Sequence, residues 1–251
     1  KKESFDKYKD FWNEYGLVLK EGPAEDRENK DTIASLLLFA STYANSKDCD
    51  QTLDDYLERM GDDQDKIYFC VADTYEAAAN SPHIEGLKSK GIEVLLLTDR
   101  IDEWVMAGLM EYQGKELINV AKEDIVDEET KKVSEGDQEI ISKIQKHLGD
   151  KVSDVIISKR LTDSASCIVL PKHEPGAQLR KILEASGQTL GSSNPIFEIN
   201  MKHKLVKKLK DMKGKQFNSF VDFLYDYAVI AEGGSPQDPS KYLRQLDKYL
   251  S

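Results

Sequence analysis

The sequence predicts a two-part protein of the α/β class, α+β overall, and three observations carry this prediction. Residues 66–99 hold a β-rich run, a helical run and a second β-rich run in succession. A charged stretch, residues 120–137, has too little apolar surface for a core of its own. The chain ends in two helices, and the first of them is apolar around most of its circumference. We expect a small three-layer α/β subdomain with a parallel βαβ core, then a small mixed sheet with helices that ends in a helical hairpin.

Composition bounds the partners and the compartment. The formal net charge of −11 over 251 residues, with a pI of about 5.0, argues against nucleic acid or an anionic membrane as the main partner. We find no signal peptide and no apolar run long enough for a membrane helix, so we expect a cytoplasmic protein. Cys49, Cys70 and Cys167 are far apart and show no zinc-type spacing, so neither a disulfide framework nor a metal site is expected.

Two helices are predicted before the β-rich part. The aromatic residues Phe5, Tyr8, Trp12 and Tyr15 recur at helical spacing. The Gly and Pro of the following LKEGPAED are expected to break that helix. Residues 31–42, DTIASLLLFAST, are predicted to form a buried helix.

The βαβ unit is the clearest local pattern. KIYFCVAD, residues 66–73, is followed by a helical run with Thr74 as N-cap and Gly91 as its stop, and then by IEVLLLTD, residues 92–99. Strand, helix and strand in this order imply a right-handed crossover and parallel strands. The next run, RIDEWVMAGLMEY, predicts a helix that Asp102 can cap.

No nucleotide site or catalytic site emerges from the residues. The turn ADTYE in the βαβ unit lacks the glycines with which backbone N–H groups approach a phosphate, and GQTLGSSNP lacks the P-loop lysine. The four histidines are scattered in polar contexts, and so many carboxylates are present that pairing any two as acid and base would be arbitrary. We expect no enzymatic activity and no cofactor in this chain.

The second half predicts a different assembly. DQEIISKIQKHLGDKV, residues 137–152, is an amphipathic helix, and DVIISKRL, SCIVLP and PIFEIN are three apolar runs that predict a small mixed sheet. A short helix is expected from Pro175 to Gly187. Its apolar residues either cover the sheet or stay partly exposed as a binding surface.

The terminal hairpin has too much apolar surface for a free surface helix. Its first helix lies between Phe217 and Gly234, Gly233 suits a left-handed stop, and Asp238 with Pro239 starts the second helix. Either the hairpin packs within its own domain, or two copies pack into a four-helix bundle across a two-fold axis. The residues alone leave both alternatives open.

Several long sequence words, in this order, resemble the heat-shock protein 90 chaperone family, most closely its bacterial form. They are LVLKEGPAED, LLLFAST, IYFCVAD, NSPHIEGLKSKGIEVLLLTDRIDEW, KRLTDSASCIVL, IFEIN and FLYDYAVIAEGG followed by DP. The resemblance covers essentially the whole chain. It implies the end of a middle domain at residues 1–122, a charged junction at 123–134, and a carboxy-terminal dimerisation domain at 135–251.

The resemblance also implies function. This fragment would form homodimers and bind unfolded or partly folded client proteins, within a parent whose weak ATPase, with its ATP and magnesium, lies in an upstream domain. A bacterial 70-kDa heat-shock chaperone is a further implied partner. The family's client contacts carry over to Glu103 and Trp104 in the IDEW helix, and to Leu179, Ile182 and Leu183 in the short amphipathic helix.

The implied dimer interface lies on the terminal hairpin. Its residues are Phe220, Phe223, Leu224, Tyr227, Ala228, Ile230, Leu243, Leu246 and Leu250. One departure from the family concerns the short amphipathic helix, which opens with Pro175 and Gly176 where relatives tend to have a more apolar turn. The alternative functions are a passive homodimeric scaffold without client binding, and a small-molecule-binding α/β protein.

Overall fold

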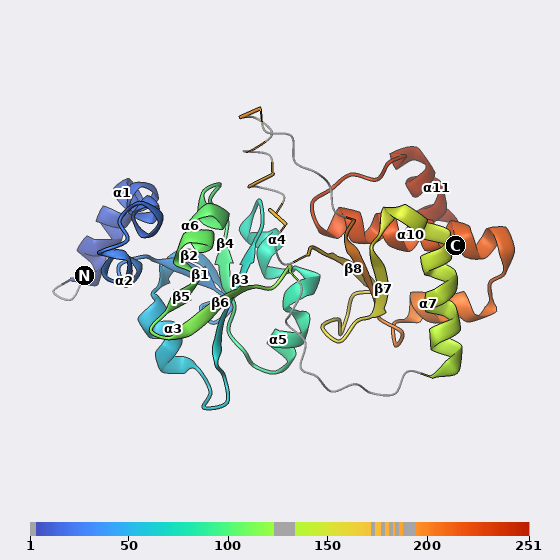
Figure 1. The fold of residues 1–251 in the computed structure, drawn as a ribbon, viewed down its shortest axis with the longest axis horizontal. Coiled ribbons are helices and arrows are strands. Elements are labelled where there is room, and N and C mark those ends of the chain that lie inside the picture. Colours follow the sequence, from blue (N-terminus) through green and yellow to red (C-terminus); the bar gives the residue numbers. More distant parts are fainter. Residues whose placement is uncertain are drawn as a thin grey trace. The chain divides into compact units, whose positions relative to one another are not determined.

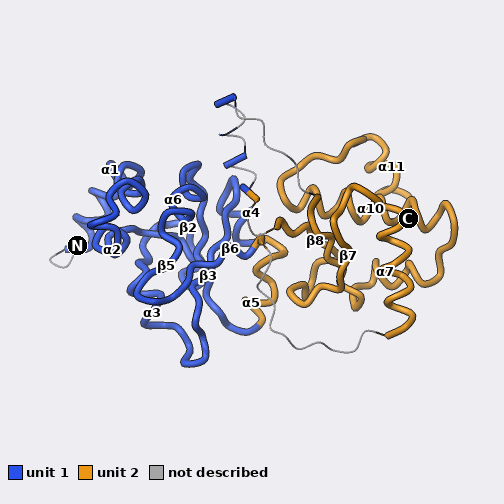
Figure 2. The backbone as a smooth tube through the Cα atoms, viewed as in Figure 1, with its two compact units in different colours: residues 1–80, 90–120, 175–190 blue, residues 81–89, 121–174, 191–251 orange. Residues whose placement is uncertain are grey.

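The computed structural model describes residues 4–122, 134–171 and 194–250, and, between the last two ranges, residues 174–176, 179–180, 183 and 186–187. The chain divides into two compact units (Figure 2). The first unit holds residues 1–80, 90–120 and 175–190, and the second holds residues 81–89, 121–174 and 191–251. The expected junction, residues 123–134, lies outside the described residues except for Ser134, which caps the helix that follows it.

A six-stranded sheet of order β2-β1-β4-β3-β6-β5 forms the centre of the first unit (Figure 1). Its strands β3 and β4 run parallel with Phe69 opposite Leu95, and β3 and β6 also run parallel. The predicted parallel βαβ core is therefore confirmed. The strands are β1 Phe39–Ser41, β2 Ser46–Gln51, β3 Lys66–Val71, β4 Leu95–Leu97, β5 Glu111–Tyr112 and β6 Lys115–Asn119.

Helices surround this sheet and close its apolar core. They are α1 Phe5–Glu25, α2 Lys30–Ala34, α3 Leu53–Arg59, α4 Tyr75–Ala79 and α6 Asp102–Leu109. The side chain of Thr74 accepts a hydrogen bond from Ala77 N, so the predicted N-cap of α4 is confirmed. Gly91 adopts a left-handed φ of 71°, as a helix stop requires.

Two helix predictions in the first unit are wrong. The expected break at Gly22 and Pro23 does not occur, and α1 continues to Glu25. Gly22 lets the helix pack closely on Ile33 of α2, since a Cβ at Gly22 would lie 2.8 Å from Ile33 Cγ2. The expected helix over residues 31–42 is α2 followed by strand β1. A short continuous apolar run fits a strand buried on both faces as well as a buried helix, and here the sheet decides.

The second unit is built on a three-stranded mixed sheet of order β7-β9-β8. Strands β7 Asp154–Ile157 and β9 Ile196–Ile199 are parallel, whereas β8 Ser166–Val169 is antiparallel to β9, which confirms the predicted mixed sheet. Its helices include α7 Glu135–Leu148, α9 Lys204–Lys207, α10 Gly214–Ala231 and α11 Pro239–Leu250. The predicted apolar face of α7 is buried: Ile140, Ile141, Ile144 and Leu148.

Helix α10 packs on this sheet, and α11 folds back onto α10. Ser166 Oγ of β8 donates to Leu224 O of α10 at 2.9 Å, inside the core. Gly233 ends α10 with a φ of 75°, and Asp238 Oδ1 accepts from Lys241 N at 2.9 Å to cap α11. The predicted helical hairpin is therefore present.

A short segment that follows α4, Ser81–Ser89, belongs to the second unit. It contains η1 Pro82–Ile84 and α5 Glu85–Ser89. The Glu85 carboxylate accepts hydrogen bonds from three successive backbone N–H groups of residues 162–164, at 2.7, 2.8 and 3.1 Å. The imidazole Nε2 of His83 lies 2.7 Å from Glu232 Oε1. Polar contacts thus bind this segment to the rest of the second unit.

Candidate functional site

Helix α6 presents one large apolar side chain to solvent at its start. Trp104, in the first turn, is 39% exposed, whereas its neighbours Asp102 and Glu103 are buried. At the other end of the helix Met110 is also exposed, and its backbone has a positive φ of 35°. Sequence reasoning did not single out Met110, because nothing in the helical periodicity marks the residue that leaves the helix.

A buried ion cluster anchors the start of α6. Lys20 Nζ of α1 lies 2.6 Å from Asp102 Oδ1 and 2.6 Å from Asp99 Oδ2. The other oxygen of Asp102 accepts from Asp99 N at 2.9 Å, and the N-cap position is Ile101, without a side-chain hydrogen bond. Asp102 is therefore the first residue of the helix. The expectation that Asp102 caps this helix is wrong.

The two ends of this cluster titrate in ways that follow from one cation shared by two anions. Burial lowers the pKa of Lys20, but the charges and hydrogen bonds of Asp102 and Asp99 outweigh it and leave that pKa raised. Burial raises the pKa of Asp102, and the charge and hydrogen bond of Lys20 oppose this only in part. Lys20 is thus held as a cation, while the buried Asp102 carboxylate depends on it.

Glu103 binds the start of the second candidate client segment. Its carboxylate accepts hydrogen bonds from Gly176 N and, at 3.1 Å, from Leu179 N. The side chain is only 5% exposed. The structure therefore brings together two of the candidate client residues, Glu103 and Leu179, although they are 76 positions apart in the sequence.

The other candidate client residues are placed as follows. Leu179 and Leu183 are half-buried, and they belong to the first unit together with Trp104. Ile182 lies outside the described residues.

The terminal hairpin, α10 and α11 in Figure 1, carries apolar residues of two kinds. Some are buried in the core of the second unit, and others are exposed. Four candidate interface residues are buried within the chain itself: Phe220, Phe223, Leu224 and Ala228. Tyr227 and Leu246 are half-buried, Ile230 is exposed and Leu243 is 57% exposed, while the side chain of Leu250 lies outside the description. The surface that a second copy could cover is therefore smaller than the sequence implies, because α10 uses one apolar stripe on its own sheet.

Aromatic rings and one carboxylate hold this hairpin together. The rings of Phe223 and Tyr242 stack with centroids 5.4 Å apart, and those of Phe220 and Tyr249 meet edge to face at 4.6 Å. Asp222 lies between α7 and α11, 2.9 Å from His147 Nε2 and 2.9 Å from Lys241 Nζ. Burial raises the pKa of Asp222, but the hydrogen bonds and charges of Lys241 and His147 together outweigh it and leave that pKa lowered.

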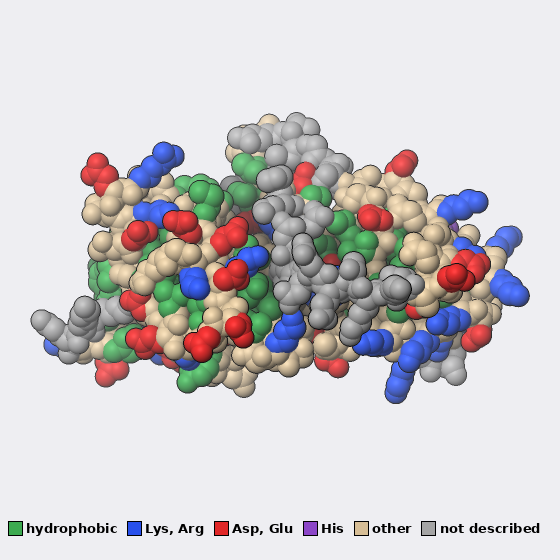
Figure 3. Space-filling model, turned by 60° about the horizontal axis from the view of Figure 1, so that its bottom comes forward, with side chains coloured by type: hydrophobic (Ala, Val, Ile, Leu, Met, Phe, Trp, Pro, Cys, Tyr) green, Lys and Arg blue, Asp and Glu red, His purple; other side chains and the backbone are tan. Residues whose placement is uncertain are grey.

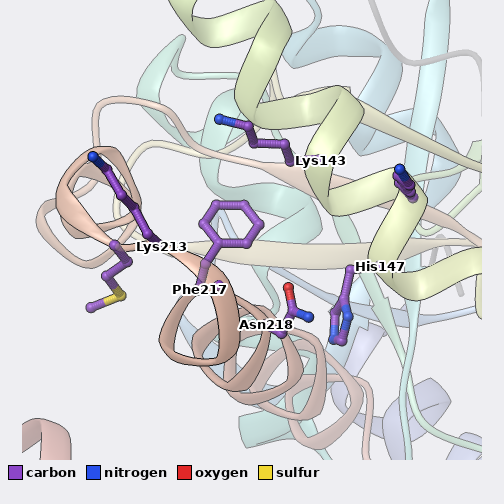
Figure 4. Close-up of a pocket in the computed structure, with 8 residues that line it drawn as sticks. Lys143, His147, Lys213, Phe217 and Asn218 are labelled. Atoms are coloured by element: carbon purple, nitrogen blue, oxygen red, sulfur yellow. The ribbon is translucent and has the colours of Figure 1, made fainter.

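A cavity of about 460 Å³ lies between α7 and the start of α10. Figure 4 shows Lys143 and His147 reaching from α7, and Phe217 and Asn218 from α10. The described residues that line it include His147 and three lysines but no carboxylate, so its lining is basic. It lies in the second unit.

Exposed apolar side chains are concentrated in the first unit. Figure 3 shows hydrophobic side chains reaching the surface there among acidic and basic ones. In the described part of the chain, those of the first unit are Phe5, Phe11, Tyr15, Leu17, Val18, Tyr43, Trp104 and Met110.

Neither a metal-binding group nor a membrane-spanning helix is found in the ranges that the structure describes. No group of three or more His, Cys, Asp or Glu side chains there could hold a metal ion. Within the same ranges, every helix is too short or too polar to span a bilayer.

Comparison with known proteins decides the family. The family model described as Hsp90 protein matches residues 1–251. The chain belongs to the Hsp90 family. It is 44% identical over 254 residues to the chaperone protein HtpG of Aromatoleum aromaticum, which covers 98% of this chain and 39% of that relative.

Other Hsp90-family relatives agree. The chaperone protein HtpG of Colwellia psychrerythraea is 45% identical over 98% of this chain and 39% of its own length. That of Legionella pneumophila, strain Paris, is 42% identical over 97% of this chain and 40% of its own length. The chain therefore spans about two fifths of the curated relatives it matches.

Proposed function

We propose that this Hsp90-family chain is a chaperone segment that forms homodimers and binds unfolded or partly folded client proteins. The observation that carries the proposal is Trp104: a large ring, 39% exposed, on a helix start that buried ion pairs hold in place. Removing apolar surface from water contributes about 25 cal/mol of favourable free energy per Å². A binding partner that covers the exposed Trp104 ring would therefore gain affinity from this contact. Trp also suits varied partners, because it offers an apolar face and a polar edge.

The dimer would form through the terminal hairpin. One side of α10 packs on its own sheet, and the rings of α11 pack on α10, which leaves Ile230 and Leu243 exposed next to half-buried Tyr227 and Leu246. Two such hairpins related by a two-fold axis would cover these side chains as a four-helix bundle. A second copy would also bring a second client surface, which raises the effective concentration for clients that reach both.

The whole protein's activity belongs to the same proposal. The relatives are about two and a half times as long as this chain, which covers 39% of the first of them. We place the ATP and magnesium site and the weak ATPase in the part of the parent upstream of these residues. A bacterial 70-kDa heat-shock chaperone would be a partner of that whole protein.

Binding of a permanently unfolded protein tests the client proposal. The probe is fluorescently labelled, reduced and carboxymethylated α-lactalbumin, titrated with the 251-residue chain. Trp104→Ala should weaken binding by roughly tenfold, as loss of an aromatic anchor does. The control is Tyr15→Ala, which removes another exposed ring of the first unit and should leave the affinity unchanged.

If the unmodified 251-residue chain and Trp104→Ala bind the probe with equal affinity, the proposal that Trp104 contacts clients is wrong. If the unmodified 251-residue chain forms dimers but does not bind the probe at all, a passive homodimeric scaffold is the better description. A small molecule that raises the melting temperature would instead favour the small-molecule-binding alternative.

A further inference from the structure

We propose that Glu103 is a positioning residue: its carboxylate holds the backbone at Gly176 and Leu179, so that Leu179 and Trp104 belong to one client surface. The proposal rests on the proposed client-binding function and assigns Glu103 a role other than direct contact. Glu103 and Trp104 are successive residues of α6. The first is buried against Gly176 and Leu179, whereas the second is exposed.

The first argument is the set of hydrogen bonds. Arg180 N donates to Gly176 O at 2.9 Å, a helical bond from residue i+4 to residue i. The N–H groups of such a first turn have no partner within the turn itself. Oε1 of Glu103 accepts from Gly176 N, and Oε2 accepts from Leu179 N at 3.1 Å. Both oxygens of one carboxylate thus satisfy the beginning of this segment, and their negative charge suits the positive end of a helical turn.

The second argument is independent and concerns the glycine. A Cβ on Gly176 would lie 2.6 Å from Glu103 Oε1 and 2.7 Å from Oε2. Any side chain at this position would force the carboxylate and the backbone apart. The Pro175-Gly176 opening, where the resemblance leads one to expect a more apolar turn, therefore has a physical explanation: glycine admits the carboxylate to the backbone.

The third argument is that Glu103 has almost no surface for a client. It is 5% exposed, and its neighbour Asp102 is fixed by Lys20 at 2.6 Å. A client that reached the Glu103 carboxylate would have to displace the two backbone donors. Loss of Glu103 is therefore expected to weaken client binding through the segment that carries Leu179, while Trp104 acts by contact.

The consequence is a composite surface. One peptide unit of α6 separates the residue that holds Leu179 from the residue that contacts the client, so the two client elements lie within reach of one extended apolar segment of a client. A segment that contacts one element would find the other at high effective concentration. Release of the Glu103 contact would leave two weaker, independent sites.

The test compares four single variants of the 251-residue chain: Glu103→Ala, Glu103→Gln, Gly176→Ala and Trp104→Ala. Hydrogen exchange of the Gly176 and Leu179 amides reports the contact, and affinity for labelled, carboxymethylated α-lactalbumin reports its effect. Glu103→Ala and Gly176→Ala should each speed exchange and weaken binding by about tenfold. Glu103→Gln keeps one acceptor oxygen and should fall between Glu103→Ala and the parent.

Three further measurements separate positioning from contact and from misfolding. Trp104→Ala should weaken binding with the exchange of both amides unchanged. The double variant of Glu103→Ala with Gly176→Ala should lose no more affinity than either single variant, because both remove the same contact. A melting temperature close to that of the parent shows that the first unit stays folded in Glu103→Gln.

The outcomes decide the two proposals separately. Unchanged amide exchange in Glu103→Ala, or additive losses in the double variant, would overturn the positioning role whether or not clients bind. The other outcome is that Glu103→Ala speeds amide exchange but the unmodified chain does not bind the probe. That result would confirm the Glu103 contact and overturn the client-binding function.

Discussion

Replacement of Lys20 by methionine removes the only cation that the described contacts bring to the buried Asp102 carboxylate. Lys20 is 3% exposed, and its Nζ lies 2.6 Å from Asp102 and 2.6 Å from Asp99. Methionine fills most of the space but leaves a fully buried carboxylate without a counter-charge. Removal of one partner of a buried ion pair costs about 3–5 kcal/mol, so the free energy of unfolding should fall by that amount near neutral pH.

The pH dependence of this loss has a definite sign. The pKa of Asp102 is already raised by burial, and loss of Lys20 raises it further. A group whose pKa is higher in the folded state favours folding when protonated, and this contribution is lost as pH rises through the folded pKa. The deficit of Lys20→Met should therefore be largest at about pH 7.5 and should shrink towards about pH 5, as Asp102 takes up a proton.

Tryptophan fluorescence during urea unfolding measures this effect in the right unit. Both tryptophans, Trp12 and Trp104, belong to the first unit, and Lys20 Nζ lies 6.0 Å from the Trp12 ring centre. The matched control is Lys9→Met, which breaks a 3.7 Å surface pair with Asp48 and should cost less than about 1 kcal/mol at either pH. A Lys20→Met deficit no larger than that of the control, or one that grows as pH falls, would refute the reasoning.

The remaining predictions concern the Ser81–Ser89 segment and are read by calorimetric unfolding. Gly86→Ala places a Cβ 2.8 Å from Arg160 O, a backbone atom that cannot move alone, and should destabilise by about 1–3 kcal/mol; Gly136→Ala, in α7 with nothing within 4 Å, should be neutral or stabilising by up to about 1 kcal/mol. Equal effects of the two alanines would contradict the packing. Glu85→Ala leaves the three N–H groups of residues 162–164 to water and should cost about 1–2 kcal/mol, since this carboxylate is partly exposed; an unchanged transition would show that the contact is not formed in solution.

Local patterns could be predicted from the sequence where one element decides its own structure. The βαβ unit follows from two β-rich runs around a helix that has Thr74 as cap and Gly91 as stop, all close together in the chain. Strand β2, Ser46–Gln51, was missed because SKDCDQ is polar and lies at the edge of the sheet, where its partner β1 specifies it. The continuation of α1 past Pro23 depends on packing against α2, which no local rule contains.

The candidate site divides in the same way. The tryptophan in the IDEW word could be found from the sequence, and its exposure is consistent with a contact role. The role of the preceding Glu103 depends on Gly176, 73 positions away, and only the folded chain brings the two together. In the hairpin α10 is apolar around most of its circumference, so the residues could not show that Phe220 and Leu224 face their own core while Ile230 is exposed.

Sedimentation of the chain tests dimerisation, the central claim, most directly. One copy of the 251-residue chain has a mass of 28.4 kDa, and the unmodified chain should sediment at twice that mass. Leu243→Glu places a charge in the proposed interface, at a leucine that is 57% exposed, and should give protomers; Leu17→Glu, at a leucine of α1 that is 58% exposed, should remain dimeric. A parent that sediments as a single protomer at every concentration, or a Leu243→Glu variant as dimeric as Leu17→Glu, would contradict the account.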